Sequence, residues 1–313
     1  MTVKSFFHVG PKEKCVRALM SLDVVQRFAP GLASRVCDPN SSVSREFTID
    51  FHGYRYRGET KNHIDWCAYF LKYFAVPEAR FIESLANFVK RQQRFVCLEI
   101  GANVGLRTLM MARVADDVIA LEPVPGAFAR LEEKIRSNRL NHVKYFKTMM
   151  DEITGDLALE VMSPSNFVAI RKETSLTKGA FGGLIVPAVK GDDFLSHQQM
   201  DPPNFIRIDA RSDALKVLKG LVGTVHQARP VVLIEHPLIS SGQAIDEDSL
   251  RSVLYNDVEI ATLRDFVMDG TFSIDPFEPS ARKLICFPSA LRRMARQEGA
   301  KRIGLGMSTV SGM

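Results

Sequence analysis

The chain has 313 residues, 46% of them hydrophobic and 25% charged, which excludes a largely disordered or low-complexity protein. No stretch approaches the roughly 18 uncharged apolar residues of a membrane span, and residues 1–10 lack the pattern of a secretory signal. The five cysteines contain no Cys-x-x-Cys pair and the seven histidines no tight pairing, so we predict no metal-ligand set and no disulfide framework. These features indicate a globular, cytoplasmic protein.

The net charge of +5 is unevenly distributed along the chain. Between Arg282 and Arg302 there are seven lysines and arginines and a single acid, Glu298. Such a segment can bind anionic lipid, nucleic acid or a phosphorylated substrate, or it can be a solvated helix that leads into a frayed terminus. Nucleic acid is disfavoured, because Phe287 is the only aromatic residue available for stacking there.

Residues 1–93 are expected to form an N-terminal extension of helices and a short hairpin. Residues 46–57 alternate as two strands should, with a turn at His52-Gly53. Apolar spacing and composition predict helices over residues 16–28, 66–74 and 78–90. The aromatic run at 66–74 either packs against the following domain or lines a substrate pocket.

From residue 94 the pattern becomes a regular alternation of strands and helices. Helices are predicted over residues 104–114, 125–140 and 213–226, and residues 163–183 are predicted to be irregular. Strands are predicted over residues 95–100, 118–121, 143–148, 184–189, 205–209, 231–235, 258–263 and 283–287. This alternation predicts an α/β domain over residues 94–288, with a mostly parallel sheet and helices on both faces. Residues 289–313 would be a basic C-terminal tail.

Ligands of such sheets bind just beyond the carboxyl ends of the strands, so the residues that follow each strand are the informative ones. The first strand runs into Gly101-Ala102-Asn103-Val104-Gly105, a tight turn, and the second ends at Glu122, a carboxylate placed to bind ribose hydroxyls. A dinucleotide fingerprint would need glycine at positions 103 and 106, where the chain has Asn103 and Leu106. A P-loop is excluded as well. A nucleoside ligand without pyrophosphate remains, and S-adenosylmethionine is the common one.

Four segments in this order resemble the FkbM family of S-adenosylmethionine-dependent methyltransferases. They are EIGANVG at 99–105, LEP at 121–123, FIRIDARSDALKVLKG at 205–220 and RPVVLIEH at 229–236. The resemblance covers roughly residues 94–240. It implies the Rossmann-like class I methyltransferase fold, with a seven-stranded sheet, and S-adenosyl-L-methionine as the cofactor.

The resemblance also implies roles for individual residues. The cofactor's methionine and sulfonium part would be bound by Glu99, Gly101, Asn103 and Gly105. Its ribose would be bound by Glu122, and Met150 and Asp151 would lie near its adenine. The catalytic candidates are Asp209 and His236 as bases, with Glu235 as an orienting partner.

Each of these residues also has a purely structural interpretation. The two glycines can simply close a turn, and Glu122 can be a charge at the N-terminus of a helix. Asp209 can cap the helix that begins near Asp213. Glu235 can be a buried, paired carboxylate, and His236 can be a loop histidine.

One departure from the family concerns the acceptor side. The family pattern Lys-Ile-Asp-x-Glu-Gly-x-Glu reads here Arg207-Ile208-Asp209-Ala210-Arg211-Ser212-Asp213-Ala214. A base replaces an acid at Arg211, which indicates an anionic acceptor or a lost activity. We predict O-methylation of a hydroxyl on a saccharide, lipid or secondary metabolite. The alternatives are a non-catalytic interaction protein with this fold and a methyltransferase that acts on nucleic acid.

Overall fold

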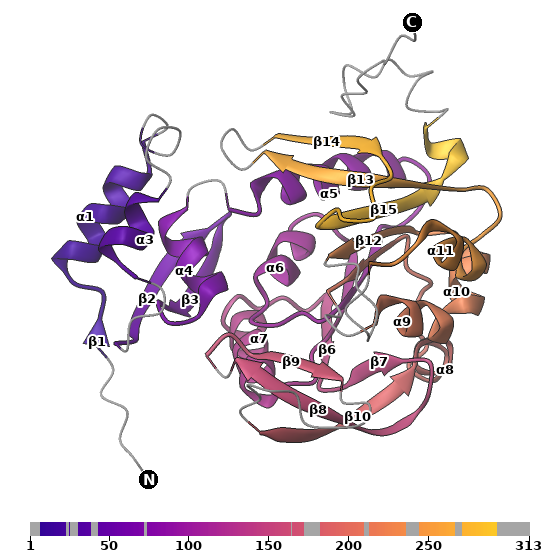
Figure 1. Ribbon diagram of the computed structural model, residues 1–313, viewed down its shortest axis with the longest axis horizontal. Coiled ribbons are helices and arrows are strands. Elements are labelled where there is room, and N and C mark those ends of the chain that lie inside the picture. Colours follow the sequence, from indigo (N-terminus) through magenta and orange to yellow (C-terminus); the bar gives the residue numbers. More distant parts are fainter. Residues whose placement is uncertain are drawn as a thin grey trace, which may run out of the picture.

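The computed structural model describes residues 7–22, 25, 31–38, 43–71, 74–163, 165–171, 182–209, 213–235, 244–266 and 271–292. The strands in these ranges form one large sheet and two smaller ones, of three and four strands (Figure 1). Within the described residues, no helix combines the length and the apolar composition that crossing a membrane requires.

The large central sheet has eight strands. In spatial order these are β14 (Thr271–Pro276), β13 (Val258–Phe266), β15 (Lys283–Pro288), β12 (Val231–Glu235), β11 (Phe205–Ile208), β4 (Val96–Ile100), β5 (Asp117–Leu121) and β6 (Val143–Phe146). The strands from β12 to β6 pair in parallel, while β15 is antiparallel to both β12 and β13. The predicted mostly parallel α/β sheet is confirmed. Strand β14, antiparallel to β13 at the edge, is an eighth strand that was not predicted.

Helices cover both faces of this sheet because its inner strands are apolar on both sides. In β4, Cys97 belongs to one core cluster and Leu98 to the other, as alternation along a strand requires. The helices on the Cys97 face are α5 (Val76–Val89), α6 (Leu106–Ala112) and α7 (Pro125–Ser137). Those on the Leu98 face are α8 (Gly191–His197), α9 (Ala214–Gly220), α10 (Val222–Ala228) and α11 (Glu247–Val253).

The order of the strands reverses beside β4. The chain passes outward from β4 through β5 to β6, and then returns to the other side of β4 with β11 and β12. Neighbouring loops therefore diverge at the carboxyl ends of β4 and β11, and a crevice for a ligand is expected there.

One predicted strand belongs to a different sheet. Residues 184–189 were expected in the central sheet, but β10 (Gly183–Lys190) pairs with β7 and β8 in the four-stranded sheet. Its burial explains this, because Val186 and Ala188 are buried while Ile185 between them is 66% exposed. Only one face of β10 is covered, unlike β4. The other strands of this sheet are β7 (Met149–Asp151), β8 (Gly155–Ser163) and β9 (Val168–Arg171).

The predicted and observed bounds of the helices differ most at two places. Residues 213–226 form two helices, α9 and α10, which meet at Leu221. At the end of α9, a Cβ on Gly220 would lie 2.1 Å from the carbonyl oxygen of Asp151, so α9 ends in close backbone contact with β7. The helix predicted over residues 16–28 is α1 (Pro11–Met20), whose first position is a proline with φ already suited to a helix.

The N-terminal elements gather at one end of the molecule (Figure 1). They are β1 (Phe7–His8), β2 (Arg45–Phe51), β3 (Tyr54–Glu59), α1, α3 (Leu32–Val36) and α4 (His63–Phe70). The predicted turn at His52-Gly53 is confirmed, with φ of 53° and 88°. Helix α5 lies within the predicted extension of residues 1–93, yet it packs against α6, β13 and β14 of the central sheet.

A buried carboxylate joins the N-terminal hairpin to α7. Asp65, fully buried, accepts hydrogen bonds from the Tyr56 hydroxyl (2.6 Å), the Arg130 guanidinium (2.6 Å) and the Glu59 backbone N–H (2.9 Å). The Lys134 ammonium lies 4.4 Å from the centre of the Tyr56 ring. Two residues of α7, Arg130 and Lys134, thus supply the positive charge that Asp65 requires inside the protein.

We expect Arg130→Met to destabilise the protein by about 3 kcal/mol, because it removes a charged partner from a fully buried carboxylate. Chemical denaturation measures this change. Arg136→Met on the same helix is the control, since the Arg136 side chain is 72% exposed in its pair with Glu132 and its loss should leave stability unchanged. Equal effects of the two substitutions would contradict the assignment.

Candidate functional site

The turn after β4 is built on close backbone contacts. The backbone N–H groups of Gly101 and Ala102 both donate to the carbonyl oxygen of Leu121, each at 3.0 Å. Gly101 has φ +82°, and a Cβ there would lie 2.5 Å from the backbone oxygen of Asp209. A side chain at this position is excluded both by φ and by space. The turn therefore links β4, β5 and the end of β11.

Glu122 closes the same turn from β5. Its two carboxylate oxygens accept the backbone N–H groups of Asn103 (2.7 Å) and Val124 (2.8 Å). Asn103 adopts φ 50°, a left-handed conformation that asparagine tolerates. Gly105 follows with φ +83°, and a Cβ there would lie 2.8 Å from the Leu131 side chain of α7. The structure thus brings Gly101, Asn103, Gly105 and Glu122 together, as predicted from their place after the strands.

Burial raises the pKa of Glu122 to about 7, although the two backbone N–H donors oppose that shift. A carboxylate that is 4% exposed is costly to ionise unless further donors reach it. Each of its oxygens carries a second lone pair beyond the one that a backbone N–H uses. The Glu122 carboxylate can therefore accept further hydrogen bonds, for example from hydroxyl groups, beside the turn.

Glu99 lies on β4, just before the turn, and is fully buried. One of its oxygens accepts the Thr108 hydroxyl, while Oε1 has no hydrogen-bond donor among the described residues. Burial raises the pKa of Glu99 to about 7, although Arg207 and the Thr108 hydrogen bond oppose the shift. Arg207 Nη1 lies 3.8 Å from Glu99 Oε1, beyond hydrogen-bond distance, so this oxygen retains the capacity to accept a donor.

Arg207 is the centre of a charged cluster at the carboxyl edge of the sheet. Its side chain, 1% exposed, pairs with four carboxylates. The distances from its guanidinium are 2.7 Å to Glu78, 3.6 Å to Asp209 and 3.8 Å to Glu99, and its contact with Glu235 is a direct hydrogen bond. The guanidinium Nη1 has no hydrogen-bond acceptor within the described part of the chain.

Glu78 of α5 is a second centre of the same cluster. Besides Arg207, it pairs with Lys283 at 2.8 Å and with Arg107 at 3.4 Å. Burial alone would raise the pKa of Glu78, but Lys283, Arg207 and Arg107 outweigh burial and hold that pKa well below its ordinary value. Sequence reasoning missed Glu78, Arg107 and Lys283, because none of them belongs to a motif and the cluster forms only when α5, α6 and β15 meet.

The two described catalytic candidates differ in their surroundings. Glu235, 2% exposed, pairs with Arg207, with Arg107 at 3.5 Å and with Arg282 at 3.3 Å. Burial raises its pKa, but the two buried arginines outweigh burial and lower it, which makes Glu235 a weak base. The Asp209 side chain is 16% exposed, and its backbone N–H donates to the Ile100 carbonyl oxygen at 2.9 Å. Asp209 therefore sits directly beside the turn.

The remaining predicted site residues are placed as follows. Met150 is fully buried, and its sulfur lies close to Gly191 at the start of α8. Asp151 is 1% exposed and accepts the Glu152 backbone N–H at 2.8 Å. Both lie on β7, in the four-stranded sheet. Their place near the adenine of the cofactor stays a prediction. His236, like residues 210–212, lies outside the described residues.

The basic segment at the C-terminus is partly engaged in this cluster. Lys283 is buried against Glu78 and Arg282 pairs with Glu235, while Arg292 pairs with Glu259 at 2.9 Å. These three basic residues form ion pairs with acidic residues of the domain, so the interpretation as a freely solvated basic segment does not hold for them. Arg293, Arg296, Lys301 and Arg302 lie outside the described residues.

Ser165 and Asn166 connect the N-terminal part of the chain to the turn. The Asn166 side-chain oxygen accepts the His63 backbone N–H at 2.6 Å, and the Ser165 carbonyl oxygen accepts the Asn62 side chain at 2.9 Å. The Asn103 side chain donates to the Asn166 carbonyl oxygen at 3.3 Å. The N-terminal elements thus reach the turn through one intermediary.

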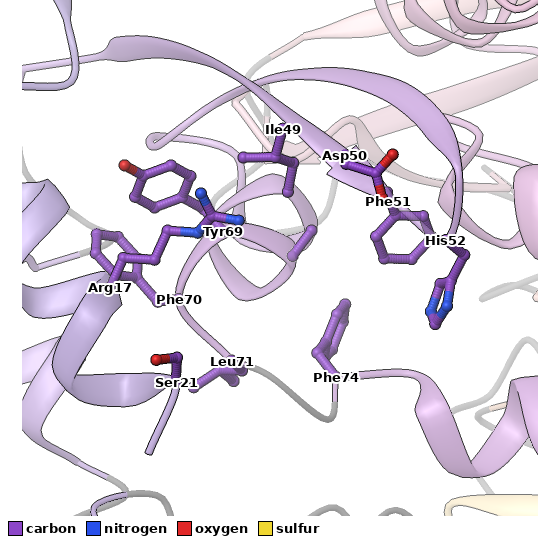
Figure 2. Close-up of a pocket in the computed structure, with 11 residues that line it drawn as sticks. Arg17, Ser21, Ile49, Asp50, Phe51, His52, Tyr69, Phe70, Leu71 and Phe74 are labelled. Carbon is purple, nitrogen blue, oxygen red and sulfur yellow. The ribbon is translucent and has the colours of Figure 1, made fainter.

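A cavity of about 240 Å³ opens beside the predicted aromatic run (Figure 2). Tyr69, Phe70 and Phe74 line it together with residues of α1 and β2, and the Arg17 guanidinium lies 4.8 Å from the centre of the Tyr69 ring. Phe74 also lies 5.8 Å from the guanidinium carbon of Arg107, a member of the charged cluster. The aromatic run therefore both packs in the core and lines a cavity.

In the described parts of the chain, no three His, Cys, Asp or Glu residues gather as metal ligands.

Comparisons with known proteins point to methyltransferases. The chain is 26% identical over 142 residues to the hexuronic acid methyltransferase AglP of Haloferax volcanii, a match that covers 45% of this chain and 56% of the relative. It is 27% identical over 153 residues to the protein-L-isoaspartate O-methyltransferase of Dechloromonas aromatica, with 47% and 67% covered. The chain thus spans little more than half the length of the first relative. No family model matches the sequence.

Among solved structures, the chain is similar to the methyltransferase FkbM from Methylobacillus flagellatus. The sequence identity is 16%, the TM-score is 0.41, and the match covers 72% of this chain and 52% of that one.

We expect Gly101→Ala to destabilise the protein more than Gly53→Ala does. Both glycines have φ between 80° and 90°, so both substitutions carry the left-handed backbone penalty of about 1–2 kcal/mol. Only at Gly101 does the new Cβ meet a backbone oxygen, whereas nothing lies within 4 Å at Gly53. An additional loss of about 1–3 kcal/mol at Gly101 is expected in urea denaturation. Equal losses would mean that the turn can move away from Asp209.

Proposed function

We propose that the protein is an S-adenosylmethionine-dependent O-methyltransferase of the FkbM type. The observation that carries this proposal is the turn at Gly101–Gly105, closed by Glu122 from β5 and by the Asp209 backbone from β11. It lies where the strand order reverses, the position at which α/β sheets bind nucleotides. The two curated relatives, both methyltransferases, support the same activity.

The residues at the turn fit this cofactor. The spare lone pairs of Glu122 suit two ribose hydroxyls, and those donors would favour the ionised carboxylate despite its burial. Glu99 Oε1, which has no donor among the described residues, suits the ammonium group of the methionine part. Gly101 has no Cβ, which lets the Asp209 backbone pack against the turn and shape the site.

When bound, S-adenosylmethionine supplies an electrophilic methyl group, and the chain must hold an acceptor hydroxyl in line with it. Orientation of this kind lowers a barrier by about 7–11 kcal/mol without a covalent enzyme intermediate. Asp209 would take the proton of the hydroxyl, since it borders the turn and retains 16% exposure. Glu235, paired with Arg107 and Arg207, would orient neighbouring groups.

We propose a saccharide, lipid or secondary metabolite as the acceptor, with an anionic sugar as the first class to test. The similarity to a hexuronic acid methyltransferase supports this class. So does Arg282, a 69% exposed guanidinium anchored at the end of β12 by Glu235. The cavity beside the aromatic run adjoins Arg107 through Phe74, and we propose it as a place where part of such an acceptor binds.

Calorimetric titration tests the cofactor assignment. We expect micromolar binding of S-adenosylmethionine and its demethylated product, no binding of NAD, and at least about tenfold weaker cofactor binding in Glu122→Ala, a loss of 1.4 kcal/mol. Glu132→Ala, a partly exposed α7 residue paired with Arg136, is the matched control and should bind like the wild type. Absence of cofactor binding in the wild type would favour a non-catalytic interaction protein.

Asp209→Asn is expected to lower the rate of methyl transfer by about 10²–10⁴-fold while leaving cofactor affinity within a factor of two or so. Radiolabelled methyl transfer to a panel of uronic acid and neutral glycosides measures the rate, with RNA as a separate arm. Unchanged turnover in Asp209→Asn would remove Asp209 from the role of base. Methylation of RNA alone would replace the proposed acceptor class.

A further inference from the structure

We propose that Glu78, a residue of helix α5 in the predicted N-terminal extension, is a positioning residue of the candidate site. It holds Arg207 and Arg107 in place and thereby sets the charge and orientation of Glu99 and Glu235. The inference deepens the proposed function and rests on it for its cofactor readout. It makes α5 part of the functional unit.

The geometry of Glu78 is that of a bridge. Its two carboxylate oxygens divide their contacts, Oε1 with Arg207 at 2.7 Å and Oε2 with Lys283 at 2.8 Å and Arg107 at 3.4 Å. The three cations come from three different elements, β11, β15 and α6. Glu78 is fully buried, so bulk water does not screen these contacts.

Both arginines that Glu78 holds extend to the candidate site. Arg207 reaches Glu235 by a hydrogen bond and lies 3.8 Å from Glu99, and Arg107 lies 3.5 Å from Glu235. An arginine guanidinium has a fixed, planar set of donors, so anchoring one nitrogen orients the others. The contact of Arg207 Nε with Glu78 therefore fixes where its Nη1 and Nη2 point.

The pKa of Glu99 depends on this arrangement of Glu78 and the two arginines, so it can be used to detect a change in the arrangement. Burial raises its pKa to about 7, Arg207 and Arg107 oppose the rise, and the negative charge of Glu78 adds to it. The titratable, charged or polar groups around Glu99 come from its own strand and four other elements: Cys97 of β4, Arg107 and Thr108 of α6, Glu122 after β5, Arg207 of β11 and Glu78 of α5. Removal of the Glu78 charge acts on the pKa of Glu99 directly, and it also frees Arg207 to move toward Glu99.

Both effects have the same sign. Without the charge of Glu78, less negative charge surrounds Glu99 and the ionic attraction between position 78 and Arg207 is lost, so the ionised form of Glu99 is favoured and its pKa falls. In the wild type, Glu99 ionises as the pH rises through about 7. In Glu78→Gln, ionisation occurs at lower pH, and affinity for a cofactor whose ammonium group binds the carboxylate persists to lower pH as well.

The test is a carboxyl-carbon NMR titration of the full chain labelled at glutamate, with the Glu99 signal assigned by its loss in Glu99→Gln. We expect the Glu99 midpoint to fall by about one pH unit in Glu78→Gln, a tenfold change in proton affinity. The pH at which S-adenosylmethionine affinity declines, measured by calorimetry, should shift in parallel. A role in packing alone would not move either midpoint.

Two further variants complete the design. Glu83→Gln, on the same helix, removes a carboxylate that is 47% exposed and lies 3.9 Å from Arg113, and it should leave both midpoints unchanged. Should Glu78→Gln fail to fold, the double variant Glu78→Gln with Lys283→Met removes the buried pair together and should still lower the Glu99 midpoint. An unchanged Glu99 midpoint in the folded Glu78 variant overturns the proposal. Absence of cofactor binding in the wild type would refute the proposed function, while the NMR titration would still decide the role of Glu78.

Discussion

The structure of the candidate site depends on one buried guanidinium, that of Arg207. A charged side chain inside a protein is tolerated only when opposite charges and hydrogen bonds replace the water it has lost. Arg207 meets this condition through Glu78, Glu99, Asp209 and Glu235, which reach it from α5, β4 and the ends of β11 and β12. The carboxyl edge of the sheet and helix α5 are therefore fixed relative to one another by charge as well as by apolar packing.

The N-terminal part of the chain does more than cover the central sheet, because its residues also contact the charged cluster and the turn. Glu78 enters the charged cluster, residues 62–63 reach the turn through Asn166, and Phe74 lies against Arg107. The Asp65 contacts with Arg130 attach the same part to α7, which begins beside Glu122. Several links thus reach the charged cluster and the turn from an end of the chain that carries no recognisable motif.

The two carboxylates at the turn differ from those in the cluster for a simple physical reason. Glu99 and Glu122 are buried with too few donors, so burial dominates and raises the pKa of each. Glu78 and Glu235 are equally buried, but arginines and a lysine outweigh burial and lower theirs. The first pair retains capacity for donors on a ligand, whereas the second pair is committed to the protein.

The sequence by itself determined the local features: the apolar central strands, the hairpin turn at His52-Gly53 and the turn of glycines after β4 followed by Glu122. Each of these follows from residues adjacent in the chain, through alternation, positive φ or strand-to-helix spacing. Only the tertiary structure decided that β10 leaves the central sheet, and that Glu78 meets Arg207 and Lys283, which lie 129 and 205 residues away. Long-range charge pairing has no periodicity, and a buried glutamate in an amphipathic helix looks in sequence like any solvated one, so the cluster becomes visible only when the helices are packed on the sheet.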